Sequence, residues 1–144
     1  IIAEGPDLVI HAQDKILERM NDYVHEMHHS SGLLDEVRRS KISIEEAEAK
    51  TLEFLDEYLE AKYKPPLCGN SIGTDRRFLD AQMNSLERRL HYRVIDVSSI
   101  KELAMRWNPE IDAKISPKME THRALDDIIE SIEELKFYRE NLFK

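Results

Sequence analysis

A histidine and two neighbouring carboxylates lie near the end of this chain, in the segment Thr-His-Arg-Ala-Leu-Asp-Asp at residues 121–127. An imidazole can accept a proton near neutral pH, and carboxylate oxygens are the ligands that cations such as Mg²⁺ prefer. His122, Asp126 and Asp127 are therefore candidates for a metal-assisted proton transfer. A purely structural role also suits them, because acidic side chains stabilise the first turn of a helix. The residues alone do not decide between Asp126 and Asp127.

A second polar segment, Gly-Asn-Ser-Ile-Gly-Thr-Asp-Arg-Arg-Phe at residues 69–78, holds two of the four glycines. It follows an apolar run and precedes a helical pattern, and glycine lets a ligand come close to the backbone. Ser71 and the free N–H groups of the helix are candidates for binding a phosphate. Asp75 is expected near the carboxyl end of the strand, where open α/β sheets bind ligands. The alternative is a plain strand-to-helix turn capped by Thr74 or Asp75.

Three histidines, His25, His28 and His29, share one face of a predicted helix. Such a spacing suits a transition metal, but no cysteine or carboxylate cluster nearby completes a ligand set. A single histidine that contacts a ligand is the better interpretation of this region.

The candidate residues must be positioned by strands and helices, and the strands are predicted first. Short apolar runs at residues 1–2 and 8–10 flank a Gly-Pro turn, which predicts an antiparallel hairpin. Two further runs, at residues 67–68 and 94–97, each precede a helical pattern. This order of elements predicts an α/β fold in which helices cover a mixed sheet.

Helices are predicted where apolar residues recur at three and four positions. One continuous helix is expected across residues 16–27, and capping boxes are expected at 43–46 and 99–102. Trp107 is expected in the core rather than as a platform for stacking bases. The last helix is expected to be buried along one stripe, formed by Ala124, Leu125, Ile128, Ile129, Ile132, Leu135, Tyr138 and Leu142.

The size and charge of the chain limit the classes of function. Its 144 residues, 41% of them hydrophobic, are enough for a single domain over residues 1–144. A net charge of −8 argues against a broad surface for long nucleic acids, but it allows a small anionic ligand held by local cations or metal ions. The single cysteine, Cys68, excludes an internal disulfide.

Three segments in this order resemble the oligoribonuclease family: Gly-Asn-Ser-Ile-Gly-Thr-Asp-Arg-Arg-Phe-Leu, His-Tyr-Arg-Val-Ile-Asp-Val-Ser and Thr-His-Arg-Ala-Leu-Asp-Asp-Ile. They begin at residues 69, 91 and 121, and the resemblance covers essentially the whole chain. The ending Phe-Tyr-Arg-Glu-Asn-Leu-Phe-Lys resembles the animal branch. The resemblance implies a ribonuclease H-like fold of the DEDDh 3′-to-5′ exonucleases. The implied activity is hydrolysis of dinucleotides and very short RNA to 5′ mononucleotides.

The resemblance also implies roles for individual residues. Asp75 and Asp127 match metal ligands for two divalent cations, Mg²⁺ or Mn²⁺, and His122 matches the general base. A homodimer is implied, with Tyr92 and Arg93 reaching across its interface. Substrate contacts are implied for a further set, of which the first three residues surround the 5′ phosphate of the substrate: Ser71, Arg93, Ser98, Tyr92, Tyr23 and His28.

One departure from the family affects the expected activity. The family opens with a strand that carries Asp-x-Glu, two further metal ligands, and this chain has no such segment. We therefore expect a fragment that binds the metal pair poorly and is nearly inactive. The alternatives are a catalytically inactive module that binds nucleotides or dimerises, and a purely structural α/β domain. The resemblance implies an intracellular protein, mitochondrial or cytoplasmic.

Overall fold

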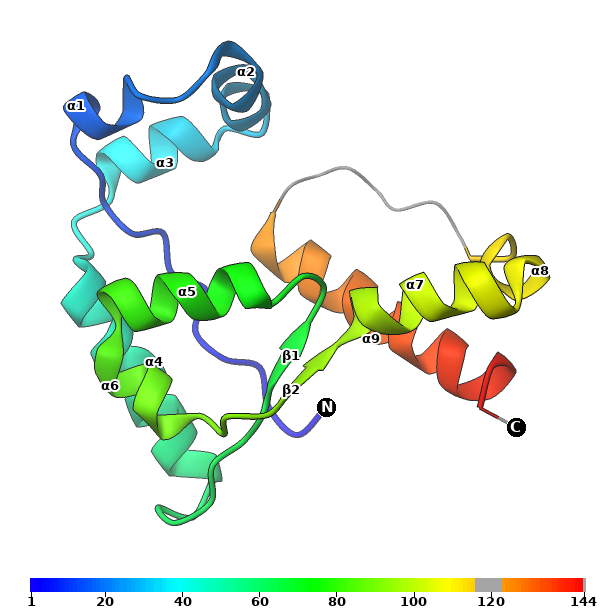
Figure 1. The fold of residues 1–144 in the computed structure, drawn as a ribbon. Coiled ribbons are helices and arrows are strands. Elements are labelled where there is room, and N and C mark those ends of the chain that lie inside the picture. The colour runs from blue at the N-terminus through cyan, green and yellow to red at the C-terminus, as the bar shows by residue number, and fades with distance from the viewer. Residues whose placement is uncertain (116–122, 144) are drawn as a thin grey trace. The chain divides into compact units, whose positions relative to one another are not determined.

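The computed structural model describes residues 1–115 and 123–143, and Figure 1 labels their helices and strands. The chain divides into two compact units. The first comprises residues 1–64 and 80–89, and the second comprises residues 65–79 and 90–144. None of the described helices is both long enough and apolar enough to cross a membrane.

Helices form the first unit, and their buried apolar side chains include Leu34, Ala47 and Leu86. The expected cap at Ser43 is confirmed, because its side chain accepts a hydrogen bond of 3.1 Å from the N–H of Glu46. Figure 1 shows the shorter helix α6 beside α4. The helices are α1 (Asp14–Leu17), α2 (Asp22–Ser30), α3 (Leu33–Arg39), α4 (Ile44–Tyr58) and α6 (Asn84–Arg89).

The predicted hairpin at the start of the chain is wrong. Within the described residues, the only pairing in this region is an isolated parallel bridge between Ile10 and Ile42. The N–H of His11 donates to the carbonyl of Ile42 at 2.8 Å, and the Ser40 hydroxyl donates to the carbonyl of Val9. The segment from residue 9 to residue 11 therefore finds its hydrogen-bond partners in the turn before α4 and not in residues 1–2.

The single helix predicted across residues 16–27 is also wrong, because it is split into α1 and α2. The side chain of Asn21 accepts a hydrogen bond of 2.9 Å from the N–H of Val24 and so starts a new helix. Asparagine in a helix interior competes for backbone hydrogen bonds, whereas at an N-cap it satisfies one. The local capping chemistry of Asn21 overrides the apolar periodicity.

The second unit contains a two-stranded parallel sheet, in which Leu67, Cys68 and Gly69 pair with Val94, Ile95 and Asp96. The strands β1 (Leu67–Gly69) and β2 (Val94–Asp96) confirm two predicted strands and the α/β class. The expected mixed sheet is not seen in the described part of the chain, where the one sheet is parallel. Helices follow both strands: α5 (Gly73–Gln82), which continues into the first unit after Leu79, α7 (Val97–Trp107), α8 (Pro109–Asp112) and α9 (Ala124–Asn141).

Helix α7 starts earlier than predicted. The carboxylate of Asp96 caps it by accepting a hydrogen bond of 3.0 Å from the N–H of Ser98, so the capping box predicted from Ser99 is wrong. The expected burial of Trp107 is wrong as well, since 67% of this residue is exposed. Trp107 is the last residue of α7, and the chain leaves helical geometry at Asn108. The core of this unit is instead formed by Val97, Ala104 and Tyr138, packed against Ile100, Ile115, Leu135, Phe137 and Leu142.

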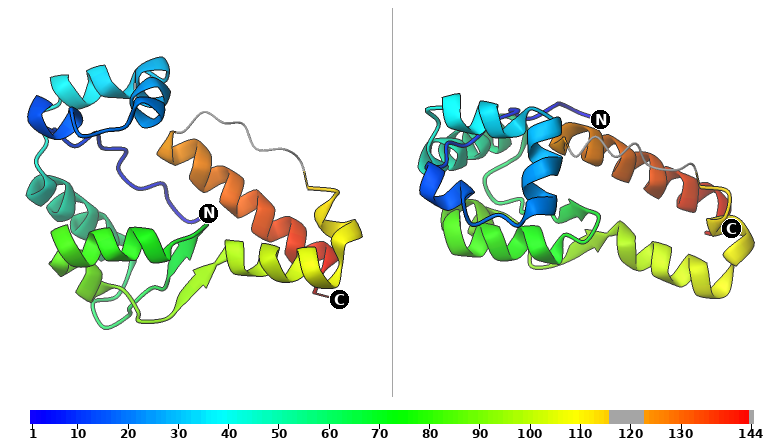
Figure 2. Two further views of the ribbon diagram at one scale, coloured as in Figure 1. Left: turned by 45° about the horizontal axis from the view of Figure 1, so that its top comes forward. Right: turned by 90° about the horizontal axis from the view of Figure 1, so that it is seen from above.

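Helix α9 lies alongside α7 and also packs against β1 (Figure 2). The apolar stripe predicted for it is wrong in its first half, because Leu125, Ile128 and Ile129 are about half exposed. Tyr138 is buried as predicted, but the other two residues that α9 buries are polar, Ser131 and Glu134. The spacing of these buried residues, by three and four positions, still defines one helix face. The polar residues of that face have partners in three other segments: Asn70 directly after β1, Lys101 on α7 and Asp112 on α8.

Candidate active site at the strand ends

The turn after β1 has an unusual backbone that places Ser71 beside the end of β2. Gly69 has a φ of 151°, and a Cβ atom there would meet the Ile72 side chain at 3.0 Å. Ser71 follows with a φ of 54°, the one positive φ of a non-glycine residue among the described ones. Such a conformation costs of order 1 kcal/mol or more and persists only where the surroundings hold it. The contacts of Ser71 show what holds it.

Ser71 and Ser98 meet where the two parallel strands end, although 27 positions separate them in the sequence. The backbone N–H of Ser71 donates to Ser98 Oγ and to Asp96 Oδ1, both at 3.0 Å. The two hydroxyl oxygens are 3.2 Å apart. The structure therefore brings together two of the three residues that were expected around a substrate phosphate.

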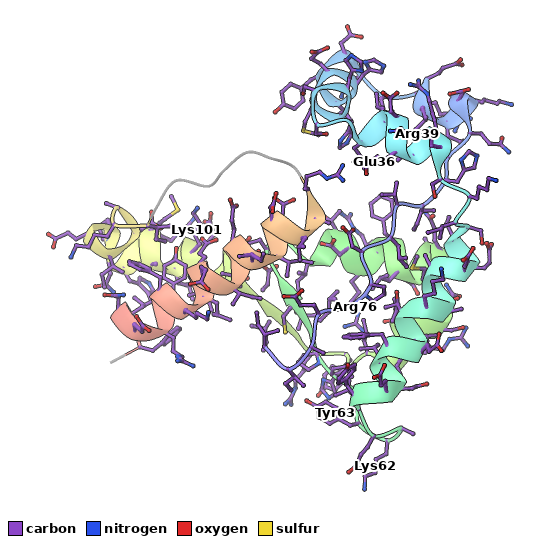
Figure 3. All side chains as sticks on the ribbon, turned by 180° about the vertical axis from the view of Figure 1, so that it is seen from behind. Glu36, Arg39, Lys62, Tyr63, Arg76 and Lys101 are labelled. Carbon is purple, nitrogen blue, oxygen red and sulfur yellow. The ribbon has the colours of Figure 1, made fainter. Side chains whose placement is uncertain are left out.

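Asn70 connects this pair to α9. Its Nδ2 atom donates to Ser131 Oγ at 2.8 Å and to Glu134 Oε2 at 3.1 Å. Its Oδ1 atom accepts from Ser98 Oγ at 3.0 Å. Lys101 on α7 lies 3.8 Å from Glu134 Oε1, and Figure 3 labels this lysine beside α9. One part-buried amide thus joins the ends of both strands to a helix that follows much later in the chain.

The two expected metal ligands lie in the first turns of α5 and α9, and both side chains are exposed. Asp75 follows the Ser71 turn directly. The carbonyl of Asp127 accepts a hydrogen bond of 2.7 Å from Ser131 Oγ, and Asp127 precedes Ser131 by four residues. Asp127 therefore shares the face of α9 that turns toward Asn70. His122 lies outside the described residues.

The residues that were expected to act across a dimer lie at the other end of β2. Arg76, labelled in Figure 3, donates to the carbonyls of His91 and Tyr92 at 2.8 and 3.1 Å. The guanidinium of Arg93 lies 5.4 Å from the centre of the Tyr92 ring. Arg93 precedes β2, whereas Ser98 follows it. Arg93 and Ser98 therefore flank β2 at its opposite ends.

Comparison with known proteins decides the family. The profile of the exonuclease family matches residues 1–135 of this chain. This chain belongs to the exonuclease family. It is 52% identical over 144 residues to an oligoribonuclease of Vibrio parahaemolyticus, and the match covers all of this chain and 78% of that protein.

Two more relatives in the family are also oligoribonucleases. The chain is 50% identical over 143 residues to the one of Corynebacterium efficiens, and the match covers 99% of the chain and 65% of that protein. It is 51% identical over 143 residues to the one of Mycobacterium tuberculosis, with 99% and 66% covered. The expected resemblance to the animal branch stays a prediction, since these three relatives are bacterial.

Tyr23 and His28, for which the family resemblance implied substrate contacts, both lie on α2 in the first unit. Tyr23 is 74% exposed. The Nδ1 atom of His28 is buried and has no hydrogen-bond partner in the described part of the chain. The rings of His25 and His29 stack at 6.1 Å, and no group of three potential metal ligands occurs among the described residues.

Four residues of this candidate site did not emerge from the sequence: Asn70, Asp96, Ser131 and Glu134. A signal for two of them exists, because Asp127, Ser131, Glu134 and Tyr138 are spaced by four, three and four residues. From the sequence alone, that polar stripe and the apolar stripe of the same helix are alternative predictions of its buried face. Asp96 also occupies the position after a β-branched run where an N-cap is expected. No comparable signal marks Asn70, whose role depends on contacts more than 25 residues away in the sequence.

Proposed function

We propose that this chain is a 3′-5′ exoribonuclease that hydrolyses dinucleotides and very short RNA oligonucleotides to 5′ mononucleotides. The observation that carries the proposal is the 52% identity over all 144 residues to a protein named oligoribonuclease. The geometry supports it, since Ser71 and Ser98 meet at the carboxyl ends of two parallel strands. Ligands bind at such strand ends in α/β proteins.

Ser71 and Ser98 would lie around the 5′ phosphate of the substrate. Ser71 is exposed, and its hydroxyl can donate to an anion that approaches the turn after β1. A phosphate held there would limit the number of nucleotides that fit between it and the reacting bond. Such a short site needs to neutralise only a couple of phosphates, which agrees with a net charge of −8.

Asp75 and Asp127 would supply carboxylate ligands to Mg²⁺ or Mn²⁺, and their chemistry fits such hard cations. The described residues offer these two carboxylates without a group of three or more ligands. We therefore expect the pair alone to bind a cation weakly. Bound divalent cations would supply Lewis acidity to the phosphodiester. The expected absence of an Asp-x-Glu strand stays a prediction.

His122 would act as the general base that removes a proton from the attacking water. An imidazole with a reference pKa of about 6.5 suits this role near neutral pH. His122 precedes Asp127 by five residues, and Asp127 begins the polar stripe of α9. Proton transfer and cation binding are thus assigned to neighbouring positions of the chain.

Arg93 and Tyr92 would act from a second copy of the chain. A strand rises by about 3.3 Å per residue, so Arg93 and Ser98 are separated by the whole length of β2. We assign the arginine that meets the two serines to another molecule, which makes a homodimer part of the proposal.

The proposal is tested by incubating the chain with 5′-labelled RNA of two to ten nucleotides, with Mg²⁺ or Mn²⁺ and with a chelator. The expected result is slow, metal-dependent release of 5′ mononucleotides that is fastest for the dinucleotide, because this chain is expected to bind the metal pair poorly. Equal rates across all lengths would contradict the short site. If RNA of no length is cleaved, the proposed exoribonuclease activity of this chain is contradicted.

The second candidate is a catalytically inactive module that still binds nucleotides. It is favoured by one observation, the lack of a group of three metal ligands among the described residues. It predicts that calorimetry detects dinucleotide binding while no metal ion supports cleavage. A purely structural α/β domain predicts neither binding nor cleavage.

A further inference from the structure

The hydroxyl groups of Ser71 and Ser98 are not equivalent, because a buried network behind them determines where each proton points. The inference drawn from this network rests on the proposed function and concerns the residues that position the phosphate-binding serines. It begins with Glu134, which is 5% exposed and lies on the buried face of α9.

Glu134 determines the orientation of the Asn70 amide. A carboxylate only accepts hydrogen bonds, so the amide of Asn70 must turn its NH₂ group and not its oxygen toward Glu134. Ser131 imposes the same orientation, because its hydroxyl donates to the Asp127 carbonyl and is left as an acceptor for Asn70. Both N–H bonds of the amide are thereby used.

The Asn70 oxygen then determines the role of Ser98. It faces Ser98 Oγ at 3.0 Å, and a carbonyl oxygen can only accept, so Ser98 donates its single hydroxyl proton to Asn70. The remaining lone pairs of Ser98 Oγ face the backbone N–H of Ser71 at 3.0 Å and its hydroxyl at 3.2 Å. Ser98 is therefore left without a proton for a ligand, whereas the exposed Ser71 hydroxyl can turn its own toward one.

We propose that Asn70, oriented by Glu134 and Ser131, is a positioning residue for the phosphate-binding turn. Asn70 accepts the hydrogen bond of the Ser98 hydroxyl, so Ser98 Oγ is oriented to accept from the N–H of Ser71. This contact stabilises the left-handed backbone of Ser71, whose φ is 54°. The Ser71 hydroxyl is then the donor of the pair that is available to the 5′ phosphate of a short RNA. Asn70 and Glu134 act on the substrate only through the serines.

The sharpest test is Glu134→Gln, which keeps the shape of the side chain but adds a donor. A glutamine can accept from Asn70 or donate to it, so only Ser131 still favours one amide orientation, and the amide is held less firmly. The two serines then share several hydrogen-bond arrangements, and Ser71 is held less firmly. We expect the preference for a 5′-phosphorylated dinucleotide over its 5′-hydroxyl counterpart to fall roughly three- to tenfold, the effect of about one hydrogen bond.

The matched control is Glu133→Gln, which makes the same change one residue earlier on the exposed side of α9, where Glu133 pairs with Lys136. It is expected to keep the wild-type preference. The preference is measured as the ratio of the two dissociation constants, and in turnover as a rise in KM with little change in kcat. If Glu134→Gln keeps the wild-type preference for the 5′-phosphorylated dinucleotide, only this inference is overturned and the proposed phosphate site is not. A wild-type chain without preference for the 5′ phosphate would overturn the proposed phosphate site and this inference with it.

A second readout does not depend on activity. In the wild type, both side-chain N–H protons of Asn70 are expected to exchange slowly with solvent, and in Glu134→Gln they are expected to exchange faster, as followed by NMR. Equal exchange in the two proteins would contradict the assigned orientation. If Glu134→Gln fails to fold, Asn70→Ala removes the amide oxygen that accepts from Ser98, and unchanged phosphate preference in that variant would overturn the proposal.

Discussion

At the scale of single residues, the two adjacent aspartates of α9 differ in the direction they take from the helix. Asp127 shares a face with Ser131 and Glu134, the face that contacts Asn70. We predict that Asp127→Asn lowers metal-dependent cleavage of a dinucleotide by about a hundredfold or more, because a charged ligand is lost. Asp126→Asn makes the same change on the next residue and is expected to stay within a few-fold of wild type. Rates of mononucleotide release distinguish the two, and a larger loss in Asp126→Asn would reverse the assignment.

The general base is the second prediction at this scale. His122→Ala is expected to reduce turnover by about 10²- to 10⁴-fold, the usual contribution of proton transfer by a side chain. Because the proposed role of His122 is chemical, the circular dichroism spectrum and the midpoint of urea unfolding are expected to stay unchanged. A near-normal rate in this variant would remove His122 from the mechanism.

At the scale of elements, the junction between β2 and α7 depends on one carboxylate. Asp96 Oδ1 accepts from the N–H groups of Ser71 and Ser98, both at 3.0 Å, and so caps α7 while it holds the turn after β1. We predict that Asp96→Ala lowers the free energy of unfolding by about 1–2 kcal/mol, measured by urea denaturation. Ser99→Ala serves as the control and is expected to change it by less than about 0.5 kcal/mol. An equal loss of unfolding free energy in both variants would support the capping box that the sequence predicted at Ser99.

The packing of α9 leads to a prediction about pH. Burial, together with the hydrogen bond from its hydroxyl to Asp112 at 3.1 Å, raises the pKa of Tyr138 above its ordinary value near 10. Above that pH the tyrosine ionises in the unfolded chain but stays protonated in the folded one, so stability is lost as the pH rises. The loss from this group approaches about 1.4 kcal/mol per pH unit.

The control for this prediction uses two tyrosines of different exposure. Tyr138→Phe is expected to flatten the fall of unfolding free energy between about pH 9.5 and 11, although it costs about 1 kcal/mol at neutral pH through the lost hydrogen bond. Tyr63→Phe, at a residue that is 52% exposed, is expected to leave the slope as in wild type. Parallel slopes in all three proteins, measured by urea denaturation, would contradict the assignment.

The sequence predicted the elements that depend on local chemistry. The Ser43 cap, the two strands before α5 and α7, and the helical character of α9 follow from residues that are neighbours along the chain. The buried face of α9 was not predicted, because Ser131 and Glu134 accept hydrogen bonds from an amide about sixty positions away in the sequence. The roles of Asp75, Asp127 and His122 came from family resemblance and stay predictions.

At the scale of the whole molecule, the residues at the strand ends belong to one of the two units. The serines and both expected metal ligands belong to the second unit, whereas Tyr23 and His28 belong to the first. The strand ends in the second unit hold only part of the site, because Arg93 lies at the opposite end of β2.

Completion of the site by a second copy can be tested by mixing two impaired proteins. If Arg93 acts across a dimer, one chain with Arg93→Ala and one with Asp127→Asn together form one intact site, in which each chain supplies what the other lacks. After random exchange of subunits, half of the dimers are mixed and one of their two sites is intact. Dinucleotide cleavage is then expected to return to roughly a quarter of the wild-type rate. If Arg93 acts within its own chain, every site lacks one of the two residues, and the mixture stays as slow as the average of the separate variants.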